Sequence, residues 1–175
     1  MKAMLMAAVL LSLPALAEEK KPTLRGILLE ELRTAHNRKD WYVPASLAVE
    51  GLTAEQAAWR DGSGNHSIGQ LANHLVFWNS RQLQRLKGEP QAKYDGNNDE
   101  TFNAFDAKSW AATVKQLDEV LGAWEKAVET MDDAKLNAWA SVIAHIATHN
   151  AYHTGQIIYI RKLHGVWDPE KGVKG

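Results

Sequence analysis

Apolar residues recur every three or four positions in four separate segments of the chain, which is the spacing of an amphipathic α-helix. The helices that this pattern predicts run approximately over 23–35, 67–86, 109–131 and 137–163. No segment shows the sustained alternation of apolar and polar residues that indicates a strand. The chain is therefore expected to be all-α, a four-helix bundle with long crossover connections.

Short local signals mark the ends of the predicted helices. Ser67 and Gln70 form a capping box, in which the serine hydroxyl caps the backbone while the glutamine side chain reaches back. Gly165 is suited to end the last helix. A helical turn over 53–59 is expected between the first two long helices. The segment after Pro90 is long, polar and rich in asparagine, and such a loop in a compact domain usually carries a function or is mobile.

The N-terminal segment has the composition of a cleaved export signal. Lys2 precedes an uninterrupted apolar run over 4–13, Pro14 breaks the run, and the small residues that signal peptidase recognises follow over 15–17. An apolar run of this length is too short to cross a bilayer, which requires about 20 residues. We therefore expect residues 1–17 to be removed and the mature protein to be periplasmic or secreted.

The rest of the chain has the size of one domain with its own hydrophobic core. We expect 18–22 to form a short lead, 23–165 the metal-binding bundle and 166–175 a flexible tail. The chain has no cysteine, which excludes a lipid-modified cysteine as membrane anchor, disulfides and thiolate ligands. A formal net charge of −1 gives no electrostatic reason to expect nucleic acid or an anionic membrane as partner. A small-molecule substrate is the natural partner, and a homodimer is one option for the oligomeric state.

Three histidines lie at intervals of four residues in the last predicted helix, namely His145, His149 and His153. Residues at i and i+4 share one face of a helix, one turn apart. The apolar residues on the same side of that helix are Val142, Ile146, Ile157 and Ile160. An unsatisfied polar group in a core costs roughly 1–3 kcal/mol, and a metal ion would satisfy two imidazoles at once. The spacing alone does not decide which adjacent pair of histidines binds.

A third ligand has to come from another helix. His74 is the strongest candidate, because Leu71, Leu75 and Trp78 place it on an apolar face of the second predicted helix. A lone histidine on such a face is more often a hydrogen-bonded core residue than a ligand. A histidine that faces an existing pair of histidines shifts the interpretation toward a metal ligand.

Two motifs combine these residues, Ser67-Ile68-Gly69-x-Leu71-x-x-His74 and His149-x-x-x-His153-x-Gly155-Gln156-Ile157. Together they resemble the DinB-like family of four-helix-bundle metalloproteins, and the resemblance spans residues 23–165. It implies His74, His149 and His153 as metal ligands, with His145 outside the set. Family members of known activity are similar to thiol-dependent transferases and isomerases, most of them intracellular, so the export signal departs from the usual member.

Three neutral imidazoles around Zn²⁺ or Ni²⁺ leave a coordination position open, and water bound there can have its pKa lowered to about 7. This donor set favours a metal-dependent hydrolase or transferase. No His-Glu-x-x-His motif supplies an adjacent carboxylate base. Polar residues within one turn of a ligand that can orient water or substrate are Gln156, Asn73, Asn150 and Tyr152. Gln156 is the preferred candidate for this catalytic role, and a purely structural hydrogen bond to the neighbouring backbone is its alternative.

Other interpretations stay open at this point. A non-catalytic bundle that binds a metal or a small molecule fits the same residues. A haem-binding bundle would have to be non-covalent, because no Cys-x-x-Cys-His occurs. Core histidines satisfied by hydrogen bonds alone would need no metal. Arg81 and Arg85 continue the His74 stripe, where they could anchor a carboxylate or phosphate or simply form a solvated helix face.

Overall fold

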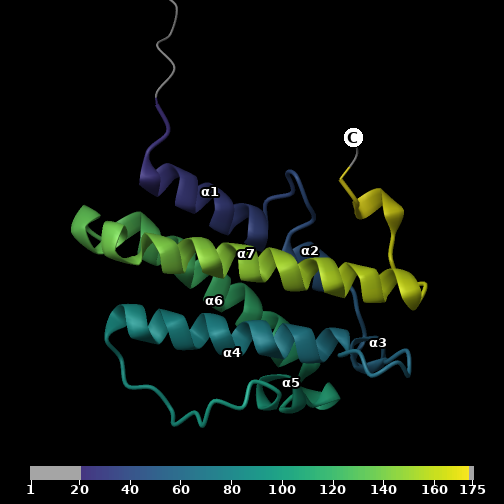
Figure 1. Ribbon diagram of the computed structural model, residues 1–175. Coiled ribbons are helices and arrows are strands. Elements are labelled where there is room, and N and C mark those ends of the chain that lie inside the picture. The colour runs from purple at the N-terminus through teal and green to yellow at the C-terminus, as the bar shows by residue number, and fades with distance from the viewer. Residues whose placement is uncertain (1–20, 174–175) are drawn as a thin grey trace, which may run out of the picture.

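Four long helices form the body of the protein (Figure 1). They are α1 (Leu24–His36), α4 (Ile68–Lys87), α6 (Trp110–Thr130) and α7 (Asp133–Leu163). The computed structural model describes residues 21–173, and this part of the chain contains no strand. The prediction of an all-α helical bundle is therefore confirmed, whereas the expected export signal at 1–17 lies outside the described residues.

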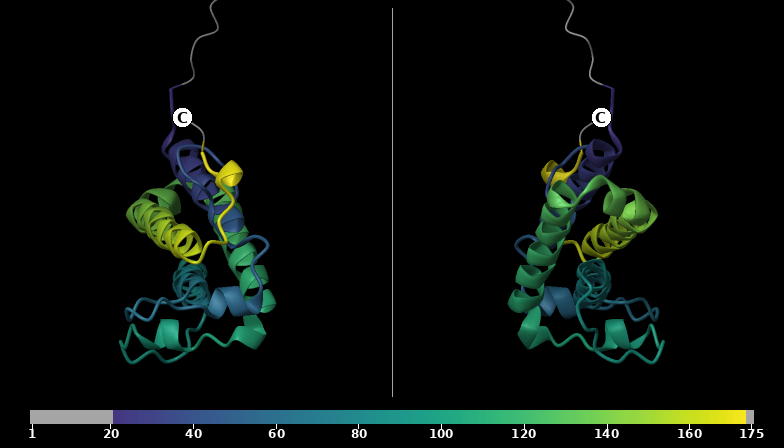
Figure 2. Two further views of the ribbon diagram at one scale, coloured as in Figure 1. Left: turned by 90° about the vertical axis from the view of Figure 1, so that its right-hand side faces the viewer. Right: turned by 90° about the vertical axis from the view of Figure 1, so that its left-hand side faces the viewer.

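The four helices surround a common core in the order α1, α7, α4, α6, as the end-on views of Figure 2 show. α1 and α7 run in one direction, and α4 and α6 run in the other (Figure 1). Because α4 and α6 are parallel neighbours, the chain between them has to return along the bundle, which accounts for the crossover over 88–109. α7 packs against both α1 and α4.

Short helical segments occupy the connections and the end of the described chain. They are α2 (Ala45–Val49), α3 (Ala54–Ala58), α5 (Glu100–Asn103), η1 (Ala107–Ser109) and η2 (Pro169–Lys171). The turn predicted over 53–59 corresponds to α3, whose Thr53 and Gln56 form a second capping box. α5 lies in the crossover and packs against α4, so the crossover is not a simple loop.

The long helices begin where polar side chains satisfy free backbone amides. The predicted capping box is present, because Gln70 N–H donates to Ser67 Oγ over 3.2 Å and Ser67 N–H donates to Gln70 Oε1 over 2.9 Å. α7 begins at Asp133 rather than near residue 137, since Asp132 accepts a hydrogen bond from Lys135 N–H over 2.8 Å. The expected break between the last two long helices therefore shrinks to a tight turn.

The core contains a polar pair among its aliphatic side chains. Asn79 of α4 and Asn150 of α7 exchange side-chain hydrogen bonds of 2.7 and 3.2 Å, and neither residue has exposed surface. The indole N–H of the fully buried Trp124 donates to the carbonyl of Asn79 over 3.1 Å. Because the hydrogen bonds between these two side-chain amides form in one alignment only, the asparagine pair fixes the register of α4 against α7. That register also brings His74 opposite His149.

The chain after α7 turns back against the bundle. The buried Arg161 donates to the carbonyls of Ala48 over 2.8 Å and Val166 over 3.1 Å. Lys39 Nζ donates to Gly172 O over 2.9 Å. The described part of the segment predicted as a flexible tail therefore lies against α2 and the end of α1. None of the helices within residues 21–173 combines the length and the hydropathy that a membrane span requires.

Candidate metal centre

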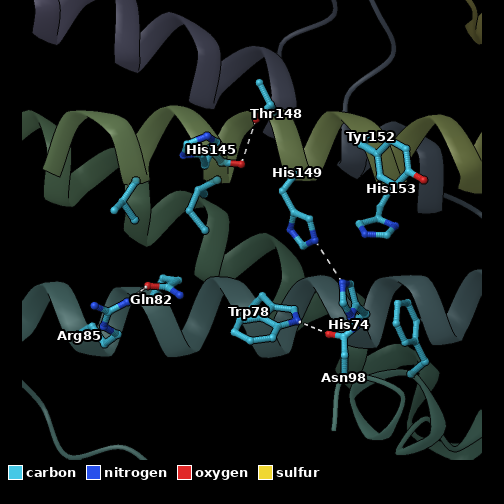
Figure 3. A pocket seen from close by; sticks show the side chains of 13 residues that line it. His74, Trp78, Gln82, Arg85, Asn98, His145, Thr148, His149, Tyr152 and His153 are labelled. Carbon is cyan, nitrogen blue, oxygen red and sulfur yellow. Dashed lines mark hydrogen bonds between the residues drawn. The ribbon is translucent and has the colours of Figure 1, made fainter. Parts of the chain in front are cut away.

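Three histidines from two helices converge inside the bundle (Figure 3). His74 lies on α4, and His149 and His153 lie one turn apart on α7. One ring nitrogen of each lies within 4.8 Å of the others, and the Nε2 atoms of His74 and His149 are 3.1 Å apart. Nitrogens at about 2.0–2.1 Å from one tetrahedral Zn²⁺ lie about 3.3 Å apart, so this donor set fits a divalent ion after small side-chain movements.

The ring of His74 is held in one orientation and one tautomer. The Thr101 hydroxyl donates its proton to Asn98 O over 2.6 Å, so its oxygen accepts from His74 Nδ1, also over 2.6 Å. With Nδ1 protonated, Nε2 carries the lone pair that faces the other two histidines. Phe102 stacks on the same ring with a centroid distance of 3.9 Å. The crossover segment therefore orients the α4 histidine.

His153 has a comparable support on α7 itself. Its Nδ1 donates to Oε1 of Gln156 over 2.6 Å, which leaves Nε2 of His153 as the metal-binding nitrogen. The side-chain amide of Gln156 therefore bonds to the ring of a candidate ligand and not to a neighbouring backbone group. The contact supports a positioning role, and the predicted role of Gln156 in orienting water or substrate stays a prediction.

The three imidazoles are held neutral because burial disfavours their charged forms. Burial lowers the pKa of His74 to about 3, with smaller contributions from His153, His149 and His66. It lowers the pKa of His149 to about 4, with a smaller contribution from His153. The pKa of His153 is also lowered by burial, and its hydrogen bond to Gln156 acts in the opposite direction. A neutral imidazole is the form that binds a metal ion, so this cluster is ready to do so at neutral pH.

The approach of the crossover to α4 depends on Gly69. A Cβ at this position would lie 2.1 Å from Cζ of Phe105, a distance that no real side chain tolerates. Glycine therefore lets this ring pack on the first turn of α4. Phe105 follows α5, the segment that carries Thr101 and Phe102. The glycine of the first motif thus allows the crossover to reach His74.

A cavity of about 860 Å³ opens from the three histidines along the groove between α4 and α7 (Figure 3). Its volume falls within the range of about 300–1,000 Å³ that is typical of small-molecule sites. Trp78, Val142 and Ile146 form an apolar part of its wall. No acidic residue lines it in the part of the chain that the structure describes. A carboxylate general base is therefore missing from the described wall.

His145, whose contribution the spacing left open, is separate from the cluster. It is exposed and lies one turn before His149, where it lines the cavity. The metal-site cluster comprises only His74, His149 and His153 among residues 21–173. The structure therefore brings together the three histidines that the family resemblance implied.

The other residues expected to orient water or substrate lie in different surroundings. Asn150 turns away from the cavity into its pair with Asn79. Asn73 donates to Thr101 O over 2.7 Å and so helps to hold α5 on α4. Tyr152 lines the cavity and is 63 % exposed, which leaves its hydroxyl accessible to a ligand.

The sequence interpretation missed Thr101 and Phe102. Both contact His74, and both come from a crossover without helical periodicity. The only signal that pointed there was the unusual length and polarity of the segment. Their contact with His74, 27 residues before Thr101, depends on the return path of the chain.

A helical bundle with three neutral histidines at the end of a cavity belongs to the class of candidate metalloproteins. A family model described as the DinB superfamily matches residues 45–157. This match covers more than half of the chain and includes all three histidines, so the protein belongs to the DinB superfamily. No curated protein and no solved structure was found to match the chain.

Proposed function

We propose that this chain is an exported metal-binding protein of the DinB superfamily that acts as a metal-dependent hydrolase or transferase on a small molecule. His74, His149 and His153 would hold one divalent ion, and Zn²⁺ and Ni²⁺ suit imidazole ligands best. The observation that carries the proposal is the convergence of three neutral imidazoles at the end of a cavity. Within residues 21–173 no fourth side chain joins this cluster.

The chemistry would be divided between the ion and the surrounding side chains. A divalent ion on three imidazoles supplies a Lewis acid and lowers the pKa of bound water. Thr101 and Gln156 keep the rings of His74 and His153 in the orientation that presents Nε2. The apolar wall at Trp78 would contact an apolar part of the substrate.

Metal-dependent turnover is the direct test of this proposal. Untagged protein would be assayed with a panel of small esters, lactones, amides and phosphoesters, before and after chelation. We expect activity that chelation removes, that Zn²⁺ or Ni²⁺ restores and that His149→Ala abolishes. His145→Ala is the matched control and should stay active, because His145 lines the same cavity outside the cluster. Turnover that survives chelation or the His149→Ala change would contradict the proposal.

Export is proposed from the sequence of residues 1–17 alone. Processing after Ala17 would give a mature chain that begins with Glu18. N-terminal sequencing of protein recovered from the periplasm or the medium tests this directly. An unprocessed chain that stays in the cytoplasm would contradict it.

A non-catalytic metal or small-molecule binding bundle is the second candidate. The observation that favours it is the lack of acidic residues in the described cavity wall, because a hydrolase commonly uses a carboxylate base. A metal carrier should release its ion to a chelator within seconds to minutes and show no turnover. Slow release together with turnover would exclude it.

A further inference from the structure

The cavity extends well beyond the three histidines, and its far end is cationic. Arg85 follows His74 by eleven residues on the same face of α4, which places it about 16 Å further along the helix axis. Figure 3 shows Arg85 and Gln82 at one end of the groove and His74 at the other, with Trp78 between them. The groove therefore has a histidine end and an arginine end.

Arg85 keeps an unneutralised charge at this end. Its Nη1 donates to Oε1 of Gln82 over 2.9 Å, and its guanidinium lies 5.9 Å from the ring centroid of Trp139. Both contacts orient the guanidinium without cancelling its charge. The ion pairs found within residues 21–173 do not include Arg85. The side chain is exposed at the mouth of the cavity and is open to an anion.

Arg81, one turn earlier, is engaged elsewhere. Its Nη1 donates to Ala92 O over 2.9 Å, and its guanidinium lies 5.2 Å from the ring centroid of Tyr94. It does not line the cavity. Of the two arginines that continue the His74 stripe, Arg85 therefore lines the cavity, whereas Arg81 contacts the crossover segment.

The other residues that line the cavity favour a ligand of a particular charge and shape. The described lining residues include no carboxylate, and Arg85 is the one permanently charged side chain among them, so its end of the cavity favours a negative ligand group. Between the two ends the wall is formed by Trp78, Val142 and Ile146. An apolar body of the ligand would bury these side chains, whereas a compact polar anion would leave them in contact with water.

We infer that the substrate class is an elongated amphipathic monocarboxylate. Its carboxylate pairs with Arg85, its apolar body lies across Trp78 and Ile146, and its reacting group lies at the opposite end beside His149. A carboxylate matches the planar fork of a guanidinium, and one arginine balances one negative charge. This inference rests on the proposed function, because it takes the histidine end as the place of reaction.

The experiment compares octanoate with octanol, which share an apolar chain and differ in charge. Their affinities would be measured by calorimetry on metal-free full-length protein, so that the carboxylate cannot bind an ion at the histidines. We expect wild type to bind octanoate about threefold to fivefold more tightly than octanol, a modest factor because Arg85 is solvent-exposed. Arg85→Gln should abolish this preference and leave the affinity for octanol unchanged.

Arg81→Gln is the matched control, since it removes the same charge one turn away and should keep the preference. Equal binding of octanoate and octanol by wild type would overturn the inference. So would an octanoate preference that persists in Arg85→Gln, or that falls equally in both variants. Because the readout is binding without metal or turnover, a protein that fails every hydrolase assay can still show the preference. Failure of the proposed function and failure of this inference are therefore distinguishable.

Discussion

At the residue scale, two of the three clustered histidines, His74 and His153, are held in orientation by hydrogen bonds to other side chains. Thr101 accepts the Nδ1 proton of His74, and Gln156 accepts that of His153. A histidine ligand whose second nitrogen is hydrogen-bonded keeps its tautomer and its ring orientation. The affinity for a metal should therefore depend on these partners as well as on the ligands.

Thr101→Val tests this dependence, because it removes the hydroxyl and keeps the shape of the side chain. We expect Zn²⁺ affinity to fall by about 10–100-fold, measured by competition with a chromophoric chelator. Thr113→Val is the matched control, since Thr113 is also 3 % exposed but donates to the carbonyl of Ser109, the N-cap residue of its own helix α6. Equal affinities for the Thr101 and Thr113 variants would contradict the proposed support of His74.

Acidification should destabilise the metal-free protein through the same histidines. The folded pKa values of His74 and His149, about 3 and about 4, lie below the ordinary value of 6.5. Below pH 6.5 the unfolded chain therefore binds protons that the folded chain does not, and stability falls until pH reaches the folded values. Each such proton contributes at most about 1.4 kcal/mol per pH unit.

Urea denaturation of metal-free protein between pH 7.5 and pH 5 measures this slope. His149→Gln should give a shallower slope than wild type, because one titrating group is gone while the carboxylates are unchanged. Parallel slopes for the two proteins would show that His149 does not contribute.

The candidate metal ligands could be predicted from the sequence, but Thr101, which orients His74, could not. His149 and His153 are visible through i, i+4 spacing on an apolar stripe, and Gln156 lies within the same turn of helix. Thr101 contacts His74 from a segment with no periodicity, so no local pattern could identify it. The exposed position of His145 was equally undetermined, because helical spacing alone treats all three histidines of α7 alike.

At the scale of elements, the hydrogen-bonded side chains of Asn79 and Asn150 set the alignment of α4 against α7. Asn150→Leu would leave the buried Oδ1 of Asn79 without its donor, and we expect a loss of about 1–3 kcal/mol in unfolding free energy. The double variant Asn79→Leu with Asn150→Leu should cost less than the sum of the two single changes. Urea denaturation of wild type, the two single variants and the double variant gives a double-mutant cycle. Strictly additive losses of unfolding free energy would show that Asn79 and Asn150 are not coupled.

The two motif glycines should respond in opposite directions to alanine. In Gly69→Ala the new methyl group would collide with Phe105, so we expect a loss of about 1–3 kcal/mol and weaker metal binding as the crossover shifts. A Cβ at Gly155 would meet no atom within 4 Å, so Gly155→Ala should stabilise α7 by up to about 1 kcal/mol. Thermal denaturation compares the pair directly, and a stabilising change at Gly69 would contradict the packing described.

The extents of the long helices could be predicted closely, and the short elements could not. Apolar periodicity and the Ser67 capping box locate α4 because both signals are local. α7 starts before the predicted residue 137, because Asp132, in the gap between the two predicted helices, caps the helix with its side chain. α2 and α5 have too few residues to show a period, so only packing against the long helices defines them.

At the scale of the whole molecule, topology links the crossover to the candidate metal centre. α4 and α6 are parallel neighbours, so the chain between them returns past the start of α4 and carries Thr101 to His74 (Figure 1). The sequence supports an all-α bundle and the DinB resemblance because those depend on periodicity and short motifs. The contact between Thr101 and His74 depends on the direction of two helices, which no local pattern encodes.

The central claim, a metal ion held by His74, His149 and His153, is tested most directly by elemental mass spectrometry of untagged protein. About one equivalent of Zn or Ni per chain is predicted for wild type and for His145→Ala, and almost none for His74→Ala and His149→Ala. Circular dichroism would establish that the variants are folded. Wild-type protein that takes up no metal after reconstitution with Zn²⁺ or Ni²⁺ would contradict the account and leave a bundle with hydrogen-bonded core histidines.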